Sequence, residues 1–258
     1  MSEDIPIMLA GQVPQRGAGP EDLGVIQYLP TSLKGVAERA RRFIRPSLVH
    51  RSKHRRSLTE RFVDSLPPDA SVLNVGAGAS DYGMHVVNLD IAPGQGIHVV
   101  GVAEHLPFQN GVFEGIVFQA VLEHVTDSRQ ALSEIRRVLR PGGTVFVEVP
   151  FIQGYHAAPR DHRRYTEQGL RAELEQQGFT VEETGVAVGP ASGMAWVTAE
   201  FLALLVSGRS TRAYRFARLA STWLAWPIEW ADAWLDGHEM AHVIASGVWA
   251  QARKPQDP

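Results

Sequence analysis

The chain has 258 residues, of which 44% are hydrophobic and 21% charged, and its formal net charge is −3. This length suits one α/β domain with additions, and the small net charge gives no sign of a polyanionic partner. The absence of cysteine excludes disulfides, thiolate metal sites and a cysteine nucleophile.

The sequence shows neither an N-terminal signal peptide nor an apolar run long enough to span a membrane. The first ten residues include Glu3 and Asp4, and no basic segment precedes an apolar run there. No run of about 18 apolar residues occurs. We therefore expect no signal peptide, no membrane-spanning helix and a cytoplasmic location.

Residues 1–65 read as an arm followed by a basic helical extension. The first 30 residues are rich in Gly and Pro, and ten Lys or Arg between Lys34 and Arg61 face only Glu38 and Glu60. Such charge can bind phosphate-rich partners, although a solvated helical face has the same composition. Aromatic residues that would stack on bases are sparse in this stretch, so a nucleic-acid partner is not expected.

From residue 66 to residue 190, short apolar runs alternate with helical stretches. Val- and Ile-rich runs predict strands at residues 71–75, 86–90, 97–102, 115–119, 144–149 and 179–188. Helices are predicted at 128–139, with Asp127 as N-cap, and at 170–177, with Thr166 as N-cap. Pro141 and the two glycines that follow it are expected to end the first helix. Strands joined by helices predict a doubly wound, mostly parallel α/β sheet.

A Trp-rich helical block at residues 191–240 is predicted to precede a final strand at 241–253. Four tryptophans share one helical face, and Pro227 divides the block into two shorter helices: Trp223, Trp226, Trp230 and Trp234. An apolar stripe is expected to pack against them: Phe201, Leu202, Leu204 and Leu205. A packed hairpin is the favoured interpretation. A lid or a peripheral membrane contact is the alternative, against which three acids argue because they would repel anionic lipid: Glu229, Asp232 and Asp236.

A glycine-rich turn and an acid follow the first two predicted strands of the core. The turn Val75-Gly76-Ala77-Gly78 allows open backbone dihedrals and close approach of a ligand. Because position 81 is Asp, the dinucleotide fingerprint G-x-G-x-x-G is incomplete. Asp90 ends the next strand, where a carboxylate can bind ribose hydroxyls or remain a solvated loop residue.

Three further segments complete an ordered series: residues 101–118, with Leu106-Pro107-Phe108; residues 121–125, with Leu122-Glu123-His124; and residues 134–143, with Arg140-Pro141-Gly142-Gly143. In order and spacing, the series over residues 70–182 resembles the class I S-adenosylmethionine-dependent methyltransferases with a type 11-like methyltransferase domain. The resemblance implies a Rossmann-like seven-stranded sheet whose last strand is antiparallel to the rest.

The resemblance also implies roles in binding S-adenosylmethionine. Gly76 and Gly78 would hold the methionine part, Asp90 the ribose, and Ala103 with Glu104 the adenine. Gln119 would line the methyl-transfer site.

Three positions depart from the pattern of the family. Asn74 stands where the family has an acid that binds the cofactor's amino group, and an amide oxygen accepts the same hydrogen bond without the charge. Val102 replaces an Asp that reaches the adenine, and Ser80 replaces a glycine. These changes keep open a non-catalytic protein with this fold.

The loop after residue 149 carries the candidate catalytic residues. His156 is a candidate base for an acceptor hydroxyl, and Asp161 and Arg164 would orient it or bind the acceptor, or simply pair with each other. The resemblance puts His124 beside the active site. A metal site formed by His156, Asp161 and His162 lacks a recognisable ligand spacing, so no metal is expected.

The sequence thus predicts an S-adenosylmethionine-dependent methyltransferase that acts on a small-molecule, glycan or lipid-linked acceptor, with an oxygen acceptor preferred. The alternatives are a non-catalytic interaction protein of the same fold and a nucleotide-sugar or nicotinamide enzyme on a similar sheet. Four segments are predicted: an arm and basic extension (1–65), the S-adenosylmethionine-binding core (66–190), a helical insertion (191–240), and the last strand with a tail (241–258). The oligomeric state stays open.

Overall fold

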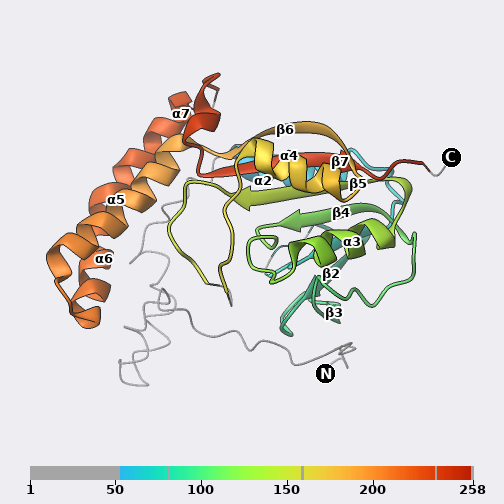
Figure 1. Cartoon of the computed structure of the whole chain (residues 1–258), viewed down its shortest axis with the longest axis horizontal. Coiled ribbons are helices and arrows are strands. Elements are labelled where there is room, and N and C mark those ends of the chain that lie inside the picture. The colour runs from blue at the N-terminus through green and yellow to red at the C-terminus, as the bar shows by residue number, and fades with distance from the viewer. Residues whose placement is uncertain (1–52, 79, 81, 158–159, 236, 257–258) are drawn as a thin grey trace.

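The computed structural model describes residues 53–78, 80, 82–157, 160–235 and 237–256 (Figure 1). The predicted arm and most of the basic stretch lie outside the described residues. The part of that stretch that is described forms helix α2 (Lys53–Asp64).

Within these residues, seven strands form one sheet in the order β3-β2-β1-β4-β5-β7-β6. The strands are β1 (Val72–Val75), β2 (Val86–Asp90), β3 (Val99–Val100), β4 (Phe113–Gln119), β5 (Leu139–Pro150), β6 (Thr180–Val188) and β7 (Gly247–Arg253). Neighbours from β3 to β5 pair in parallel, whereas β7 runs antiparallel to both β5 and β6. The predicted Rossmann-like sheet with an antiparallel last strand is confirmed.

Side chains that alternate along the strands build a hydrophobic cluster on each face of the sheet. On one face, Leu73 and Ile116 join residues of α3 (Ser128–Val138) and α4 (Glu167–Gln176). On the other face, Val72 and Val117 pack with Phe62 of α2. Figure 1 shows α3 and α4 lying in front of the sheet. The sheet therefore holds its strand ends rigidly, and the carboxyl ends of β1, β2 and β4 meet at one edge.

Local signals identified the N-cap residues of both core helices, although α4 begins at Glu167 and not at residue 170 as predicted. Asp127 accepts a hydrogen bond from the Gln130 amide at 3.0 Å, and Thr166 accepts one from the Gly169 amide at 3.0 Å. The predicted end of the first helix is wrong, because Leu139 is already extended and pairs with Phe113. Pro141 and the following glycines therefore lie within β5.

The predicted final strand is also too long at its start. Gly247 pairs with Pro150 and Val188, which end β5 and β6. Before Gly247 the chain has no strand to pair with, and Ala241–Val243 form a 3-10 helix instead. Strand β3 is shorter than predicted for the same reason, since only Val99 and Val100 pair with β2.

The Trp-rich block forms a helical hairpin that projects from one end of the sheet (Figure 1). It comprises α5 (Pro190–Ser207), α6 (Thr211–Ala225), the 3-10 helix η2 (Trp226–Ala231) and α7 (Asp232–Leu235). Pro227 lies in η2, directly after α6 ends, so the predicted interruption occurs. By length and composition alone, α5 is long and apolar enough to cross a membrane, although 44% of it is buried. The expectation that no helix spans a membrane stays a prediction.

The packing within the hairpin is the reverse of the predicted one. The buried contacts between α5 and α6 come from Ala195, Ala199 and Ala225. The apolar stripe expected to pack is mainly exposed: Phe201 (61%), Leu204 (62%) and Leu205 (67%). Small side chains let the helix axes approach closely, which leaves the large ones facing outward.

Candidate active site

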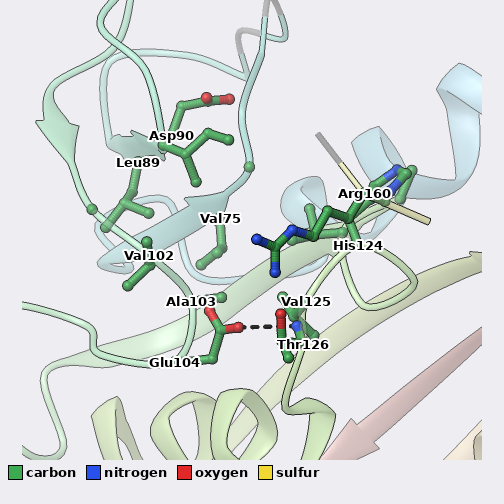
Figure 2. A pocket seen from close by; sticks show the side chains of 15 residues that line it. Val75, Leu89, Asp90, Val102, Ala103, Glu104, His124, Val125, Thr126 and Arg160 are labelled. Carbon is green, nitrogen blue, oxygen red and sulfur yellow. Dashed lines mark hydrogen bonds between the residues drawn. The ribbon is translucent and has the colours of Figure 1, made fainter. Parts of the chain in front are cut away.

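A pocket opens at the carboxyl ends of β1, β2 and β4, where ligands bind in sheets of this kind (Figure 2). Its lining comes from the glycine turn, the end of β2, the segment after β3 and the segment after β4. The lining residues are Val75, Gly76, Leu89, Asp90, Ile91, Gly101, Val102, Ala103, Glu104, Ala120, Val121, His124, Val125, Thr126 and Arg160.

The glycine turn and Asp90 form one hydrogen-bonded unit at this pocket. Gly76 has φ of +72°, and a Cβ there would lie 2.2 Å from Cγ2 of Val121, so only glycine fits. The amide of Gly78 donates to Oδ2 of Asp90 at 2.8 Å, and the amide of Ala92 donates to Oδ1 at 3.1 Å. Asp90 also lines the pocket, which puts a carboxylate at the end of β2 in its wall.

Ala103 and Glu104 lie on the opposite side of the pocket from Asp90. Oε1 of Glu104 accepts a hydrogen bond from the amide of Thr126 at 3.2 Å, a bond drawn in Figure 2. This contact joins the segment after β3 to the segment after β4. Arg160, which the sequence did not single out, also lines the pocket, and its guanidinium points inward in the same view.

Two residues expected to contact the cofactor do not line this pocket. The amide nitrogen of Asn74 donates to Oδ1 of Asn88 at 3.0 Å, so this side chain ties β1 to β2 within the sheet. Gln119 donates to Glu148 at 2.7 Å and accepts from the Tyr82 hydroxyl at 3.1 Å. Both side chains thus have partners within the protein, and their roles toward the cofactor stay predictions.

A second pocket lies on the other side of Ala120, lined by Ala120, Glu123, Glu148, Val149, Pro150, Gln153, His156, Val188, Trp196 and Gly247. Ala120 lines both pockets and has φ of +53°, the one positive φ at a non-glycine residue in the described part of the chain. Strained backbone of this kind persists where the surroundings hold it in place, often at functional sites.

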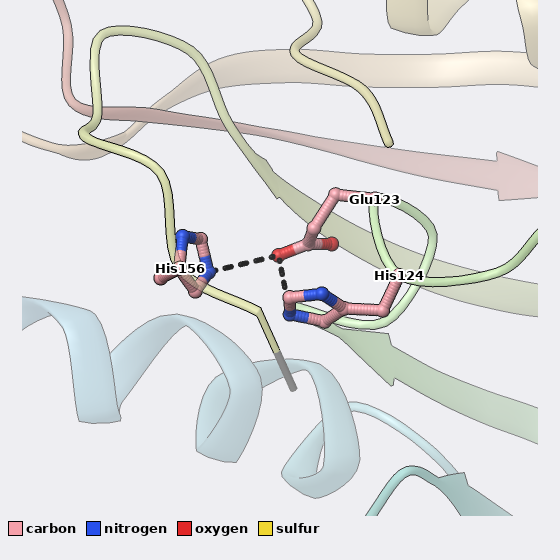
Figure 3. Close-up of side chains that lie close together, drawn as sticks. All are labelled: Glu123, His124 and His156. Atoms are coloured by element: carbon pink, nitrogen blue, oxygen red, sulfur yellow. Dashed lines mark ion pairs between the residues drawn. The ribbon is translucent and has the colours of Figure 1, made fainter. Parts of the chain in front are cut away.

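Glu123, His124 and His156 meet where the two pockets join (Figure 3). Oε1 of Glu123 lies 3.7 Å from Nε2 of His124 and 3.9 Å from Nε2 of His156. The two imidazole rings meet edge to face, with centroids 5.0 Å apart. The sequence predicted both histidines, and the fold brings them together.

Comparison with known proteins places this arrangement in a family. A family model described as a methyltransferase domain matches residues 75–147. The chain is 37% identical over 93 residues to the ubiquinone/menaquinone biosynthesis C-methyltransferase of Hahella chejuensis, covering 35% of this chain and 37% of that protein. It is 28% identical over 163 residues to the malonyl-(acyl-carrier protein) O-methyltransferase of Geobacter sulfurreducens, covering 48% of this chain and 60% of that protein.

Among solved structures, phosphoethanolamine N-methyltransferase 2 of Haemonchus contortus in complex with S-adenosyl-L-methionine shares the fold. The TM-score is 0.51 at 17% identity, over 79% of this chain and 53% of that one. Residues 75–147 therefore match the methyltransferase-domain family, and the sheet has the class I methyltransferase fold. The matches span 37% and 60% of the lengths of the two curated relatives.

The methyltransferase pocket suits the cofactor of its family. S-adenosylmethionine has a ribose, an adenine and a methionine part that carries both charges. Asp90 puts a carboxylate in the wall of the pocket, and the glycine turn leaves space that a Cβ at Gly76 would take. Arg160 adds a cation that suits a carboxylate.

Burial sets the protonation of the three clustered side chains in the methyltransferase. Glu123 is fully buried, and burial raises the pKa of its carboxyl to about 8. Burial also lowers the pKa of His124, and burial followed by the nearby His124 lowers the pKa of His156. Both imidazoles are therefore neutral at neutral pH and able to accept a proton.

The Asp161–Arg164 pair shapes the loop that carries His156. Two guanidinium nitrogens of Arg164 bond the two carboxylate oxygens of Asp161, which also accepts the backbone amide of His156 at 2.7 Å. Arg164 donates further to the carbonyls of Gln153 and Gly154. Neither Asp161 nor Arg164 lines either pocket. The geometry thus favours the role in which Asp161 and Arg164 orient His156, and not the role in which they bind the acceptor.

The helical insertion of the methyltransferase contributes to the second pocket through Trp196 of α5. Its ring lies 5.7 Å from that of His156, centroid to centroid, and its indole nitrogen is buried with no hydrogen-bond partner among the described residues. No residue of the described hairpin lines the first pocket.

Sequence reasoning missed four residues at this site: Glu123, Ala120, Trp196 and Arg160. Glu123 stood beside His124 in a quoted motif, and its charge within an apolar run was the available signal. The roles of the other three depend on backbone strain or on contacts between distant segments. No local pattern reports these.

Proposed function

We propose that this methyltransferase moves the methyl group of S-adenosylmethionine to a hydroxyl oxygen of a small-molecule, glycan or lipid-linked acceptor. The observation that carries the proposal is the junction at Ala120, where a pocket suited to the cofactor meets one lined by acid and imidazole groups. S-adenosylmethionine supplies a methyl group already activated by its sulfonium. The protein's task is therefore mainly to position the two reactants.

The first pocket would hold the cofactor through groups on three strand ends. Asp90 would accept hydrogen bonds from the ribose hydroxyls, and Ala103 with Glu104 would flank the adenine. The backbone at Gly76 and Gly78 would pass close to the methionine part, with Arg160 near its carboxylate. The methyl group would then face Ala120 and the second pocket.

The second pocket would hold the acceptor. As the new oxygen–carbon bond forms, the sulfur–carbon bond breaks and the hydroxyl proton must leave. His156 can accept that proton because burial keeps its imidazole neutral. Trp196 and Val188 would supply apolar contact to the body of the acceptor. A hydroxyl acceptor is preferred because hydroxyl groups need a base, and a base is available here.

Two features bear on the non-catalytic alternative. Asn74, one of the departures that motivated it, bonds Asn88 and does not line the pocket. Val102 does line the pocket and brings no hydrogen bond to the adenine. The alternative therefore rests on Val102, and a binding measurement addresses it directly.

Calorimetric titration of the full chain with S-adenosylmethionine tests the proposal. We expect the wild type to bind. In Asp90→Ala the free energy of binding should weaken by about 1.5–3 kcal/mol, the scale of hydrogen bonds to a charged group. Asp69→Ala, at an exposed position before β1, is the matched control and should bind as the wild type does. Melting curves would show that both variants are folded. Absence of binding by the wild type would favour the non-catalytic alternative, and equal affinity of folded Asp90→Ala would remove Asp90 from the site.

A further inference from the structure

Three acceptor atoms converge at the junction of the two pockets. The Nδ1 atom of His124 faces the carbonyl of Arg160, and that of His156 lies 3.4 Å from the carbonyl of Gly154. Carbonyl oxygens only accept, so each Nδ1 carries the proton and each neutral ring presents a lone pair at Nε2. Each Nε2 is the ring atom that lies near Oε1 of Glu123, and Figure 3 draws both contacts.

The Glu123 carboxylate has no partner that explains its burial. The side chain is 0% exposed, and neither oxygen accepts a hydrogen bond from another described residue. Buried polar groups are normally paired, and leaving one unpaired is costly. A cation at the centre of the group would satisfy all three acceptors together.

We propose that Glu123, His124 and His156 bind one divalent transition-metal ion of the zinc class. Two imidazoles and one carboxylate are a common ligand set for such ions. The backbone carbonyls that fix both rings at Nδ1 are the outer contacts that orient histidine ligands. The three candidate ligand atoms all lie within 4.8 Å of one another. Ligands of one such ion lie roughly 3–3.5 Å apart, given bonds of about 2.1 Å, so small side-chain shifts would complete the site.

The ion would leave coordination positions open toward the second pocket. An acceptor with a hydroxyl, and above all two adjacent oxygens, could bind there. This role in the reaction rests on the proposed function, whereas binding of the ion does not. With the ion bound, both imidazoles act as ligands and His156 does not act as a base.

Metal titration of tag-free, chelator-treated full chain tests the proposal. We expect calorimetry to show that one equivalent of Zn²⁺ binds. Co²⁺ bound in its place should absorb visible light, as it does when its coordination is four- or five-fold. Glu123→Gln and His156→Ala should each weaken binding by more than about 100-fold, since loss of an outer contact alone costs 10–100-fold. His162→Ala changes an exposed histidine of the same loop and should bind like the wild type.

The outcomes separate this proposal from the proposed function. The site is wrong if the wild type takes up no stoichiometric metal, or if folded His156→Ala binds Zn²⁺ as tightly as the wild type. S-adenosylmethionine affinity is measured on the same samples. Cofactor binding without metal binding overturns only the metal site, and metal binding without cofactor binding overturns only the proposed function.

An independent observation concerns the surface of the helical hairpin. Large apolar side chains are exposed on both of its helices and on the segment that follows: Phe201, Leu204, Leu205, Val206, Phe216, Leu224 and Trp234, each at least 61% exposed. Leu204, Leu205 and Val206 lie together at the end of α5, and exposed apolar surface of this kind marks a site of interaction. Arg209 and Arg212 are exposed at the turn between α5 and α6, beside the apolar tip.

Two of the three acids that argued against a lipid surface are buried, and the third, Asp236, lies outside the described residues. Asp232 is 1% exposed and accepts hydrogen bonds from the amides of Ala191 and Ser192 at the start of α5. Glu229 is 6% exposed. Glu200 pairs with Arg218 at 2.6 Å. In the described part of the hairpin, the fully exposed charges are therefore arginines.

We infer that the tip of this hairpin binds the surface of a membrane that contains anionic lipid. Apolar side chains would enter the boundary between headgroups and acyl chains, and the arginines would face the headgroups, as in interfacial helices. Each arginine near an anionic membrane surface increases the partition of the protein onto the membrane about fivefold. The same helix α5 carries Trp196 into the second pocket, so membrane contact and acceptor site are joined by one element.

Sedimentation of the tag-free full chain with vesicles tests this surface. We expect binding to phosphatidylcholine vesicles that contain phosphatidylserine, and at least tenfold weaker binding by Leu204→Glu/Leu205→Glu. Arg209→Glu/Arg212→Glu should weaken binding and reduce its dependence on salt. Arg171→Glu, at an exposed position on α4, is the control and should bind normally. The inference fails if the hairpin variants bind vesicles as the wild type does, or if the wild type stays in solution. It also fails if light scattering shows that Leu204 and Leu205 hold two copies together.

Discussion

Hydrogen bonds at Asp161 fix the position of His156. The carboxylate holds the backbone amide of His156 on one side and the Arg164 guanidinium on the other. The side chain of Asp161 is 2% exposed, so water competes little for these bonds. The Nε2 atom of His156 is thereby held at the junction of the two pockets, where an acceptor would lie.

Replacement of His156 by alanine should lower turnover by about 10²–10⁴-fold, the usual contribution of a positioned proton-transfer group. Affinity for S-adenosylmethionine should barely change, because His156 does not line the cofactor pocket. The neutral imidazole is the active form, whether it accepts a proton or holds a cation. Burial lowers the pKa of His156 below its ordinary value of 6.5. The pH at which the rate falls on the acid side should therefore also lie below 6.5. A pH profile of initial rates checks this.

His162→Ala is the control for that measurement, since it changes the same loop without changing either pocket. Full turnover and an unchanged pH profile in His156→Ala would assign His156 to structure alone. A fall in melting temperature without loss of turnover would support the same conclusion.

The role of a single residue could be predicted from the sequence where one local motif fixes both the place of the residue and the direction of its side chain. Gly76, Gly78 and Asp90 belong to one strand–turn–strand unit, and the structure joins them by hydrogen bonds. Asn74 and Gln119 bond Asn88 and Glu148 on neighbouring strands, and such partners across a sheet cannot be read from one strand's sequence. Glu123 could not be assigned, because its burial depends on β5 and the loop after it.

At the scale of elements, Glu134 and Arg137 tie helix α3 to the segment before β4. Arg137 bonds Glu134 and also donates to the carbonyls of Leu106 and Phe108, at 2.9 Å and 2.8 Å. The amide of Leu106 donates to Glu134 at 2.8 Å. This network lies directly after Ala103 and Glu104, so it helps to hold that side of the cofactor pocket.

Glu134→Gln should destabilise the protein by about 1–2 kcal/mol at pH 7, since a charge-assisted network is weakened. The hydrogen bond from Arg137 is the main cause that lowers the pKa of Glu134. The stabilisation is therefore present above the ordinary pKa of 4.5 and is lost as the pH falls through the lower folded-state pKa. Urea unfolding at neutral and acid pH should show the difference between the two proteins shrinking below pH 4.5.

Glu175→Gln serves as the comparison, because Glu175 forms only an exposed pair with Arg171 at 3.5 Å. Such pairs contribute little, so the stability of this variant should stay close to that of the wild type. A Glu134→Gln protein as stable as the wild type at pH 7 would show that the network does not hold the segment.

Element starts were predictable, because N-caps are local: Asp127 and Thr166 act as the sequence indicated. Element ends were not, because pairing decides them. Leu139 leaves the helix to pair with Phe113, and β7 begins where β5 and β6 end.

For the whole molecule, the seven-stranded sheet and its antiparallel last strand followed from the family resemblance, but the packing of the hairpin did not. Helix α5 is apolar on nearly all sides, so periodicity alone does not distinguish a buried face from an exposed one. Alanines form the buried contact, with Trp196 and Trp226 partly buried against them, while other large side chains of the block are exposed: Phe201, Leu204, Leu205, Trp230 and Trp234. The choice depends on how closely two helices approach, which is a property of the folded pair.

The central claim is that the pocket between Asp90 and Glu104 holds S-adenosylmethionine next to the acceptor pocket. A crystal structure of the full chain with S-adenosylhomocysteine tests it most directly. We predict the ribose hydroxyls at Asp90, the adenine beside Ala103 and Glu104, and the sulfur directed toward Ala120 and the second pocket. A ligand bound elsewhere, or bound here with its sulfur directed away from Ala120, would contradict the account.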